Sequence, residues 1–424
     1  MTGPLQGVRV VELASFWGAW AGRLLADLGA DVLVVEPPGG HSTRSFGPFA
    51  GDDPHPDRSL WWWYYNTSKR SVVLDLDDPL DADHFRRLVG GAGVVLEAER
   101  PGRLAALHLD HPDLRAEQPE LVWTSVTTHG RASPRSSGPW TDLTMAAASG
   151  LAWLNGYDDH SLPPMRGRGN QTLQITGTHA ALATLVALLH RDATGSGQHV
   201  DVSAFAACNV TTESGTFAWL VAGETVQRQT GRHASVNPTM DVQVRAADGR
   251  YVTTGFLPQD AKDFQALLDW LDELDLRATC PEVVFLQIGV ERGGIDVVKE
   301  RDDPEVIAIF GAARAALVHI AENVAALTFF EGAQHRDLQC GIIFSPDEAY
   351  ENSHFSARGF QSTIRHDELG RDVRYPGAPF KMSASPWAIR RRPPLVGEHT
   401  GEALALGFEA AARSDEQPPP TQGR

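Results

Sequence analysis

The stretch GVRVVELASFWGAWAGRLLADLGADVLVVE, at residues 7–36, decides the fold class. Its first and last segments are β-branched and apolar, which is typical of buried strands, and the segment between them has the apolar spacing of a helix. Gly29 comes where the end of a helix favours a residue that tolerates positive φ. The stretch therefore predicts a strand, a helix and a second strand, which together form a βαβ unit.

Similar apolar segments recur at residues 71–76, 93–97 and 121–126. Strands that alternate with helices favour a mostly parallel sheet covered on both faces. The segment TLQITGTHAALATLVALLH, at 172–190, is apolar almost throughout and predicts a buried helix that begins near Gly177. The expected fold class is therefore α/β, with a large doubly wound, Rossmann-like domain.

The pattern changes after about residue 225. Two alternating segments flank Asp248 and Gly249, which is a strong hairpin signal, and helices dominate from there to about residue 330. We therefore expect a smaller α+β domain from the middle of the chain and a disordered, Pro-rich tail. The expected ranges are 1–224 and 331–412 for the large domain, 225–330 for the small domain and 413–424 for the tail.

The composition excludes several classes of function. The formal net charge of −17 argues against general binding to nucleic acid, because such binding needs Lys and Arg to neutralise phosphates. No apolar run approaches the roughly 18 residues of a membrane-spanning helix, and no signal peptide is visible. We therefore expect no membrane partner and a cytoplasmic location. Cys208, Cys280 and Cys340 are too scattered for a zinc cluster, so no metal is expected.

Further segments follow in a recognisable order. They include NTSKRSVVLDL at 66–76, ALLHRDATGSGQHVDVS at 187–203, SPDEAYENSHFSARGF at 345–360 and PLVGEHTGEAL at 394–404. In order and spacing these segments resemble the class III CoA-transferases, the family of formyl-CoA transferase, carnitine CoA-transferase and the related α-methylacyl-CoA racemases. The resemblance covers nearly all of the chain.

The resemblance implies substrates and partners. Coenzyme A, carried as an acyl-CoA thioester, and a carboxylic acid are the implied substrates. The family architecture implies two chains threaded through each other as interlocked rings. The expected partner is therefore a second copy in a homodimer or a homologous subunit in a heterodimer.

The family's catalytic carboxylate is missing from this sequence. In the transferases an Asp attacks the thioester, which splits one difficult exchange into easier steps. The resemblance places this Asp at Leu173, or at Thr172 if the register shifts by one. The neighbours Gln171 and Gln174 are not carboxylates either, and none occurs at 170–176. This absence argues against self-sufficient transfer.

Racemase or isomerase activity is disfavoured separately. Proton removal and return at the α-carbon require two bases, and the family commonly uses a His directly before an Asp. Here Thr141 stands in place of the His, and Asp142 follows it. Asp142 also suits the N-cap of a helix at 143–150, and we favour that interpretation.

The resemblance assigns further positions to CoA binding. Arg44, Lys69 and Arg70 are expected near the CoA phosphates, because phosphate groups favour cations. A surface role is the alternative for these three residues. Glu99 is unfavourable beside an anionic nucleotide. The positions are Phe16, Trp17 and Gly18 after the first strand; Arg44, Lys69 and Arg70 near the phosphates; and Ala98, Glu99 and Arg100.

Three functions fit these patterns. The first is an active CoA-transferase whose nucleophile has moved, and the second is a CoA-binding or structural subunit whose homologous partner supplies the Asp. The third is an enzyme with different acyl chemistry on the same scaffold. The aromatic run LWWWYYN, at 60–66, is more typical of a core or an interface than of a ligand cage, and we favour a contact in the interlocked dimer.

Overall fold

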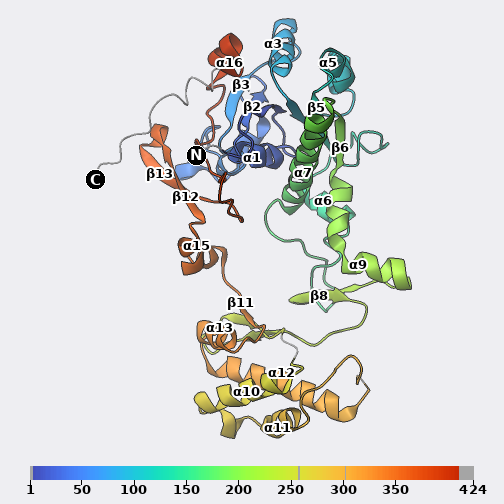
Figure 1. Cartoon of the computed structure of the whole chain (residues 1–424), viewed down its shortest axis with the longest axis vertical. Coiled ribbons are helices and arrows are strands. Elements are labelled where there is room, and N and C mark those ends of the chain that lie inside the picture. Colours follow the sequence, from blue (N-terminus) through green and yellow to red (C-terminus); the bar gives the residue numbers. More distant parts are fainter. Residues whose placement is uncertain (1–2, 256–257, 301, 410–424) are drawn as a thin grey trace. The chain divides into compact units, whose positions relative to one another are not determined.

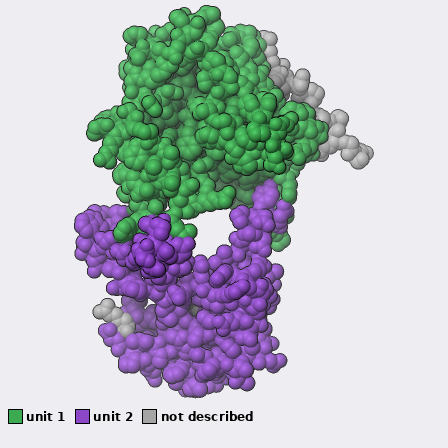
Figure 2. All heavy atoms as spheres, turned by 180° about the vertical axis from the view of Figure 1, so that it is seen from behind, with its two compact units in different colours: residues 1–153, 165–213, 352–424 green, residues 154–164, 214–351 purple. Residues whose placement is uncertain are grey.

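The computed structural model describes residues 3–255, 258–300 and 302–409, and the tail expected at 413–424 lies outside these ranges. The chain forms two compact units (Figure 2). The large unit comprises residues 1–153, 165–213 and 352–424, and the small unit comprises residues 154–164 and 214–351. The boundaries expected at residues 224 and 331 both fall inside the small unit.

A six-stranded parallel sheet forms the centre of the large unit (Figure 1), as the alternation of strands and helices predicts. The strand order β3-β2-β1-β4-β5-β6 reverses between β1 and β4. Ligands of open α/β sheets bind at such a switch point, outside the carboxyl ends of the strands. The strands are β1 Arg9–Leu13, β2 Asp31–Glu36, β3 Arg70–Val73, β4 Val94–Glu97, β5 Val122–Thr127 and β6 His199–Ser203.

Successive strand residues alternate between two apolar layers, one on each face of the sheet. Val10 and Leu96 pack with α1 and α7, whereas Val11 and Val95 pack with α3, α5 and α16. Helices therefore cover both faces, as in a doubly wound fold. The first layer uses α1 Ala19–Asp27 and α7 Gln171–Thr194, and the second uses α3 Pro79–Gly90, α5 His111–Glu117 and α16 Thr400–Leu406.

The long helix α7 begins at Gln171, earlier than the start near Gly177 that the sequence predicts. The first turn of a helix has backbone N–H groups without intrahelical partners. Here Asp142 accepts hydrogen bonds from the backbone N–H and the hydroxyl of Thr172, at 2.9 Å and 2.6 Å. This distant acceptor extends the helix, and local sequence patterns do not reveal it.

The small unit contains the expected hairpin around Asp248 and Gly249. The hairpin joins β9 Gln243–Arg245 to β10 Tyr251–Thr253, and β11 Gly341–Ile342 completes a three-stranded antiparallel sheet. Gly249 has a φ of +84°, which glycine adopts without strain. The helices α10 Ala261–Glu273, α11 Val283–Glu291, α12 Pro304–Asn323 and α13 Ala326–His335 share one apolar core with this sheet.

Shorter elements complete both units. In the large unit they are α2 Leu60–Tyr65, α4 Arg103–Ala106, α6 Asp142–Ala148, α8 Ala204–Asn209, α15 Ser353–Arg358 and the antiparallel pair β12 Gln361–His366 and β13 Arg371–Pro376. In the small unit they are α9 Ser214–Phe217, α14 Pro346–Tyr350 and the antiparallel pair β7 Gln227–Gln229 and β8 Arg232–Ser235.

Two helices, α7 and α12, are long and apolar enough by composition to cross a membrane. Half of the most apolar window of each helix is buried inside the chain. Core helices of soluble proteins have this same character. The outer face of α7 nevertheless exposes Leu182, Val186 and Leu189, which lie on one side of the helix at spacings of four and three residues.

Two stacked histidines lie where α5 meets the edge of the sheet. The rings of His111 and His199 are 4.3 Å apart, and His199 Nε2 lies 2.9 Å from Ser125 Oγ. Burial, together with charge repulsion from His111 and Arg131, lowers the pKa of His199 to about 4. Burial likewise lowers the pKa of His111.

We predict that acid destabilises the chain, because both histidines have lowered pKa values in the folded state. An unfolded histidine has a pKa of about 6.5, so the unfolded chain binds the proton first as the pH falls. The contribution of His199 to the free energy of unfolding should be fully present above about pH 6.5 and should decline as the pH falls toward about 4. Urea unfolding at about pH 7.5 and about pH 5 measures this decline. The variant His199→Gln should lose less stability between these two conditions than the wild type, and an equal loss would contradict the assignment to His199.

Candidate functional site

A cavity of about 680 Å³ lies at the carboxyl ends of β1 and β4, at the switch point of the sheet. Loops after β1, β2 and β4 line it, together with the start of α6 and the segment before α7. We call it the switch-point cavity. Its lining residues are 14–17, 41–43, 46, 98–100, 140–143, 166 and 170.

Several of the predicted site residues meet in this cavity. They are Phe16 and Trp17 from the loop after β1, Ala98, Glu99 and Arg100 from the loop after β4, and Thr141 and Asp142 from the start of α6. Gly18 lies beside the cavity lining, and its backbone N–H donates to Ser15 Oγ at 3.0 Å where α1 begins. Segments far apart in the sequence therefore converge at one cavity.

Lys69 is not available to this cavity. Its side chain is fully buried, and its ammonium group donates to Glu12 Oε1 at 2.9 Å, Asn66 Oδ1 at 2.9 Å and the Ala19 carbonyl at 3.0 Å. Burial raises the pKa of Glu12, and the charge of Lys69 opposes that rise. This placement argues against the expected role of Lys69 in phosphate binding, because all three ammonium protons are already used inside the core.

Arg44 and Arg70 are buried in the same way. Arg44 donates two hydrogen bonds to Glu36, from Nε to Oε2 at 2.6 Å and from Nη2 to Oε1 at 2.7 Å. Its Cζ atom lies 3.7 Å from the centre of the Trp62 ring. Arg70 forms a two-point contact with Asp31, at 2.9 Å and 2.6 Å. A CoA phosphate would have to break these pairs, so the structure argues against both the phosphate role and the surface role for these cations.

The position of the family nucleophile lies inside the core. Leu173 is fully buried in the apolar layer that α7 forms with the sheet. Thr172 is also buried and bonded to Asp142, whereas Gln171 is exposed at the start of α7. Gln174 Nε2 lies 3.5 Å from Tyr65 Oη. No residue of 170–176 therefore brings a carboxylate to the cavity.

Asp142 does not form the N-cap that the sequence suggests. Thr141 is the N-cap residue of α6, in a reciprocal capping arrangement with Thr144, and Asp142 is the first residue of the helix. The Asp142 carboxylate accepts two hydrogen bonds from Thr172 and one from Arg166 Nη1 at 2.9 Å. Asp142 thus joins α6, the segment before α7 and the first turn of α7 at the wall of the cavity.

Sequence reasoning missed His41, Trp140 and Arg166, which also line the switch-point cavity. The backbone N–H of His41 donates to Glu36, and His41 Nδ1 lies 2.8 Å from Thr43 Oγ1. Burial lowers the pKa of His41, so the imidazole is neutral near pH 7. The sequence signal that could have identified His41 is its place shortly after β2, at the carboxyl edge of the sheet.

A second cavity, of about 820 Å³, shares Phe16, Phe46, Arg166 and Asn170 with the first. We call it the aromatic cavity. Its other lining residues are Ser45, Gly47, Trp61, Arg168 and Gly169. The aromatic run therefore has two roles: Trp62, Trp63 and Tyr65 fill the core as expected, whereas Trp61 lines a cavity.

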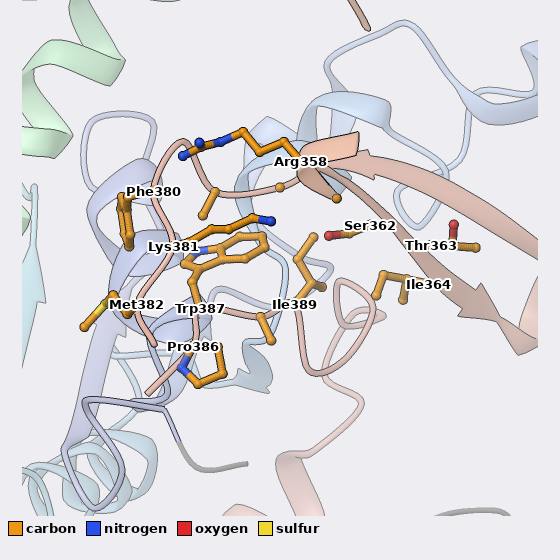
Figure 3. Close-up of a pocket in the computed structure, with 14 residues that line it drawn as sticks. Arg358, Ser362, Thr363, Ile364, Phe380, Lys381, Met382, Pro386, Trp387 and Ile389 are labelled. Atoms are coloured by element: carbon orange, nitrogen blue, oxygen red, sulfur yellow. The ribbon is translucent and has the colours of Figure 1, made fainter. Parts of the chain in front are cut away.

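A third cavity, of about 440 Å³, lies in the carboxy-terminal part of the large unit (Figure 3). Trp387 and Ile389 form part of its wall, and Lys381 and Arg358 lie close to them. Arg358 donates to the Pro379 carbonyl at 2.9 Å. This cavity shares no lining residue with the other two. Within the described ranges, no group of three His, Cys, Asp or Glu side chains could hold a metal ion.

The fold and the site define an α/β protein with a cavity at the switch point of a doubly wound sheet. Residues 5–400 match the CoA-transferase family III. The chain therefore belongs to that family, which confirms the resemblance drawn from the sequence.

Related proteins include named CoA-transferases. The succinyl-CoA:(R)-benzylsuccinate CoA-transferase subunit BbsE of Thauera aromatica is 31% identical over 412 residues, covering 95% of this chain and 94% of the relative. The succinate–glutarate CoA-transferase of Agrobacterium fabrum is 28% identical over 413 residues, covering 95% of each. A CaiB/BaiF family protein from Brucella suis shares the fold, with a TM-score of 0.76, 23% identity and coverage of 96% and 99%.

Proposed function

We propose that this chain is the CoA-binding subunit of a class III CoA-transferase, and that a homologous partner supplies the attacking carboxylate. The observation that carries the proposal is the fully buried Leu173 at the position of the family nucleophile. Carboxylate attack on a thioester needs an ionised acid that reaches the carbonyl carbon. Leu173 offers neither charge nor exposure, so transfer by this chain alone is not expected.

The switch-point cavity suits a pantetheine arm and a thioester. Phe16, Trp17 and Ala98 supply apolar walls, and Arg100 and Arg166 supply positive charge at the same cavity. Small-molecule sites combine apolar walls with a few placed polar groups in this manner. Its volume of about 680 Å³ falls within the usual range for ligand pockets.

Two observations support a partner subunit. The relative from Thauera aromatica is named as a subunit. The outer face of α7 exposes Leu182, Val186 and Leu189, at 58%, 55% and 70% of their full accessible surface. A row of aliphatic side chains on a helix is typical of a protein interface. We therefore favour a heterodimer with a homologous chain, and a homodimer is the alternative.

Two measurements test this proposal. Isothermal titration of the purified chain with CoA should show binding at one site per chain. Incubation with an acyl-CoA and a labelled carboxylate should show exchange only after a family member with the Asp is added. Absence of CoA binding, or rapid exchange by the chain alone, would overturn the proposal.

Self-sufficient transfer through Asp142 is the second candidate, because Asp142 lines the switch-point cavity. Its carboxylate already accepts three hydrogen bonds from Thr172 and Arg166. Such bonds stabilise the anion and reduce its tendency to attack a carbonyl carbon. Exchange by the chain alone that disappears in Asp142→Asn would establish this candidate. Racemisation stays disfavoured, because the Thr141 hydroxyl caps α6 and is not a base.

Glu99 should weaken CoA binding. Burial raises the pKa of Glu99, and Arg103 and Arg100 oppose that rise. At pH 7 a negative charge on Glu99 opposes the CoA phosphates. The variant Glu99→Gln should therefore bind CoA about threefold to fivefold more tightly, which corresponds to roughly 1 kcal/mol. Isothermal titration measures the change.

The pH dependence of CoA binding provides a further check on Glu99. Because protonation removes the charge, wild-type affinity should rise relative to Glu99→Gln as the pH falls through the raised pKa. The exposed Glu120→Gln removes the same charge away from the cavity and serves as the matched control. An equal gain in affinity for both variants would indicate a general charge effect and contradict the role of Glu99.

A further inference from the structure

The aromatic cavity adjoins the switch-point cavity. The two cavities share Phe16, Phe46, Arg166 and Asn170. A ligand in the aromatic cavity would therefore lie directly beside a thioester held at the switch point. This is where the second substrate of a CoA-transferase, a free carboxylic acid, has to be placed.

Three aromatic rings form one wall of the aromatic cavity. The rings of Phe16 and Trp61 are stacked, with centres 5.8 Å apart and planes inclined by 15°. Phe46 meets Trp61 edge to face, with centres 5.5 Å apart, and 39% of Phe46 remains exposed. Aromatic rings favour such stacked and edge-to-face arrangements. The wall therefore suits another flat aromatic ring better than a short aliphatic chain.

Two arginines provide positive charge at the same cavity. All three hydrogen bonds of Arg166 use Nη1, with Asp142, the Gly169 carbonyl and the Gly167 carbonyl as acceptors. Its Nε and Nη2 have no hydrogen-bond partner among the described residues, and these two donors form one edge of the guanidinium. Arg168 is exposed and forms no ion pair within the described ranges. Such an edge matches the two oxygens of a carboxylate.

We propose that this chain selects an aryl-substituted carboxylic acid as the acid substrate. The aryl ring packs against Phe16, Phe46 and Trp61, and the carboxylate binds the free edge of Arg166, with Arg168 adding charge. Arg166 lines both cavities, so this carboxylate lies at the boundary with the switch-point cavity. The inference rests on the proposed function, because it assigns the acid substrate of that same transfer.

Isothermal titration of the full chain with 3-phenylpropionate tests the proposal. Propionate lacks the ring and 3-phenylpropanamide lacks the charge, and each should bind at least about tenfold more weakly. Trp61→Leu should weaken 3-phenylpropionate binding about fivefold, and so should Arg168→Gln, which removes an exposed charge and leaves the fold intact. No detectable binding, or equal binding of propionate, would overturn the proposal.

The cavity in Figure 3 is the rival site, since it also combines a tryptophan with cations. Lys381→Met should leave the binding of 3-phenylpropionate unchanged. Loss of binding in Lys381→Met, with none in Trp61→Leu, would place the acid in the rival cavity and overturn the inference. Titration of the same samples with CoA separates this failure from failure of the proposed function, because CoA binding would then persist.

Discussion

Replacing Leu173 with Asp is expected to lower the free energy of unfolding by about 3–5 kcal/mol at neutral pH. Leu173 is fully buried and packs in the apolar layer between α7 and the sheet. The family nucleophile cannot simply be restored here, because the new carboxylate would lose its hydration and gain no cation. Urea unfolding followed by circular dichroism measures the loss.

The pH dependence of this loss separates the effect of the new side chain's charge from the effect of its shape. Burial would raise the pKa of an Asp at this position, so the penalty should grow as the pH rises above about 4 and be smaller near pH 5 than near pH 7. Leu173→Asn has a similar shape and no charge, and its penalty should not change in this way. A stable Leu173→Asp chain with transfer activity would contradict the placement of Leu173 in the core.

Replacing Lys69 with Met is the second change that we expect to have a large effect on stability. We expect this change to lower the free energy of unfolding by about 3–5 kcal/mol near pH 7, because it leaves Glu12 buried without its cation. Glu12 is fully buried, and Lys69 Nζ lies 2.8 Å from its Oε2. Urea unfolding again measures the change.

The double variant Glu12→Gln with Lys69→Met is the matched control. Removing both charges should recover a large part of the stability, since the cost in the single variant comes from the unpaired carboxylate. The folded fraction of both variants should bind CoA with wild-type affinity. A stable Lys69→Met chain that has lost CoA binding would contradict the structural role and restore the phosphate role expected from the sequence.

The parallel sheet and its two covered faces could be predicted from the sequence alone. The stretch 7–36 forms β1, α1 and β2 in the order that its apolar spacing predicts, because buried strands and an amphipathic helix leave different periods in a sequence. The hairpin around Asp248 and Gly249 was also predictable, since that turn is specified by the residues within it.

The environment of single side chains could not be predicted. Lys69 and Arg44 are cations in or near matching family segments, and their acidic partners Glu12 and Glu36 lie on β1 and β2. Only the packed sheet shows that these cations lie in its core. The start of α7 was missed for the same reason, because Asp142 is 30 residues away from Thr172 in the sequence.

The cavity itself was partly predictable. The loops after β1 and β4 were assigned to CoA binding from the resemblance, and both line the switch-point cavity. Arg166 and Trp61 were not assigned, because neither lies in a segment that the resemblance singled out. The aromatic run was instead interpreted as core or interface, with a dimer contact favoured. Trp62 and Trp63 lie in the core of the chain, and Trp61 lines a cavity, which this interpretation did not include.

Intact-mass spectrometry of the purified chain after incubation with an acyl-CoA tests the central claim most directly. In the proposed function this chain holds CoA without supplying the attacking carboxylate. A homologous partner with the family Asp should gain the mass of a covalent CoA adduct when it is incubated together with this chain and the acyl-CoA. We predict that this chain keeps its unmodified mass while it binds CoA in titration. A covalent CoA adduct on the chain alone, mapped to Asp142 or any other carboxylate, would contradict the account.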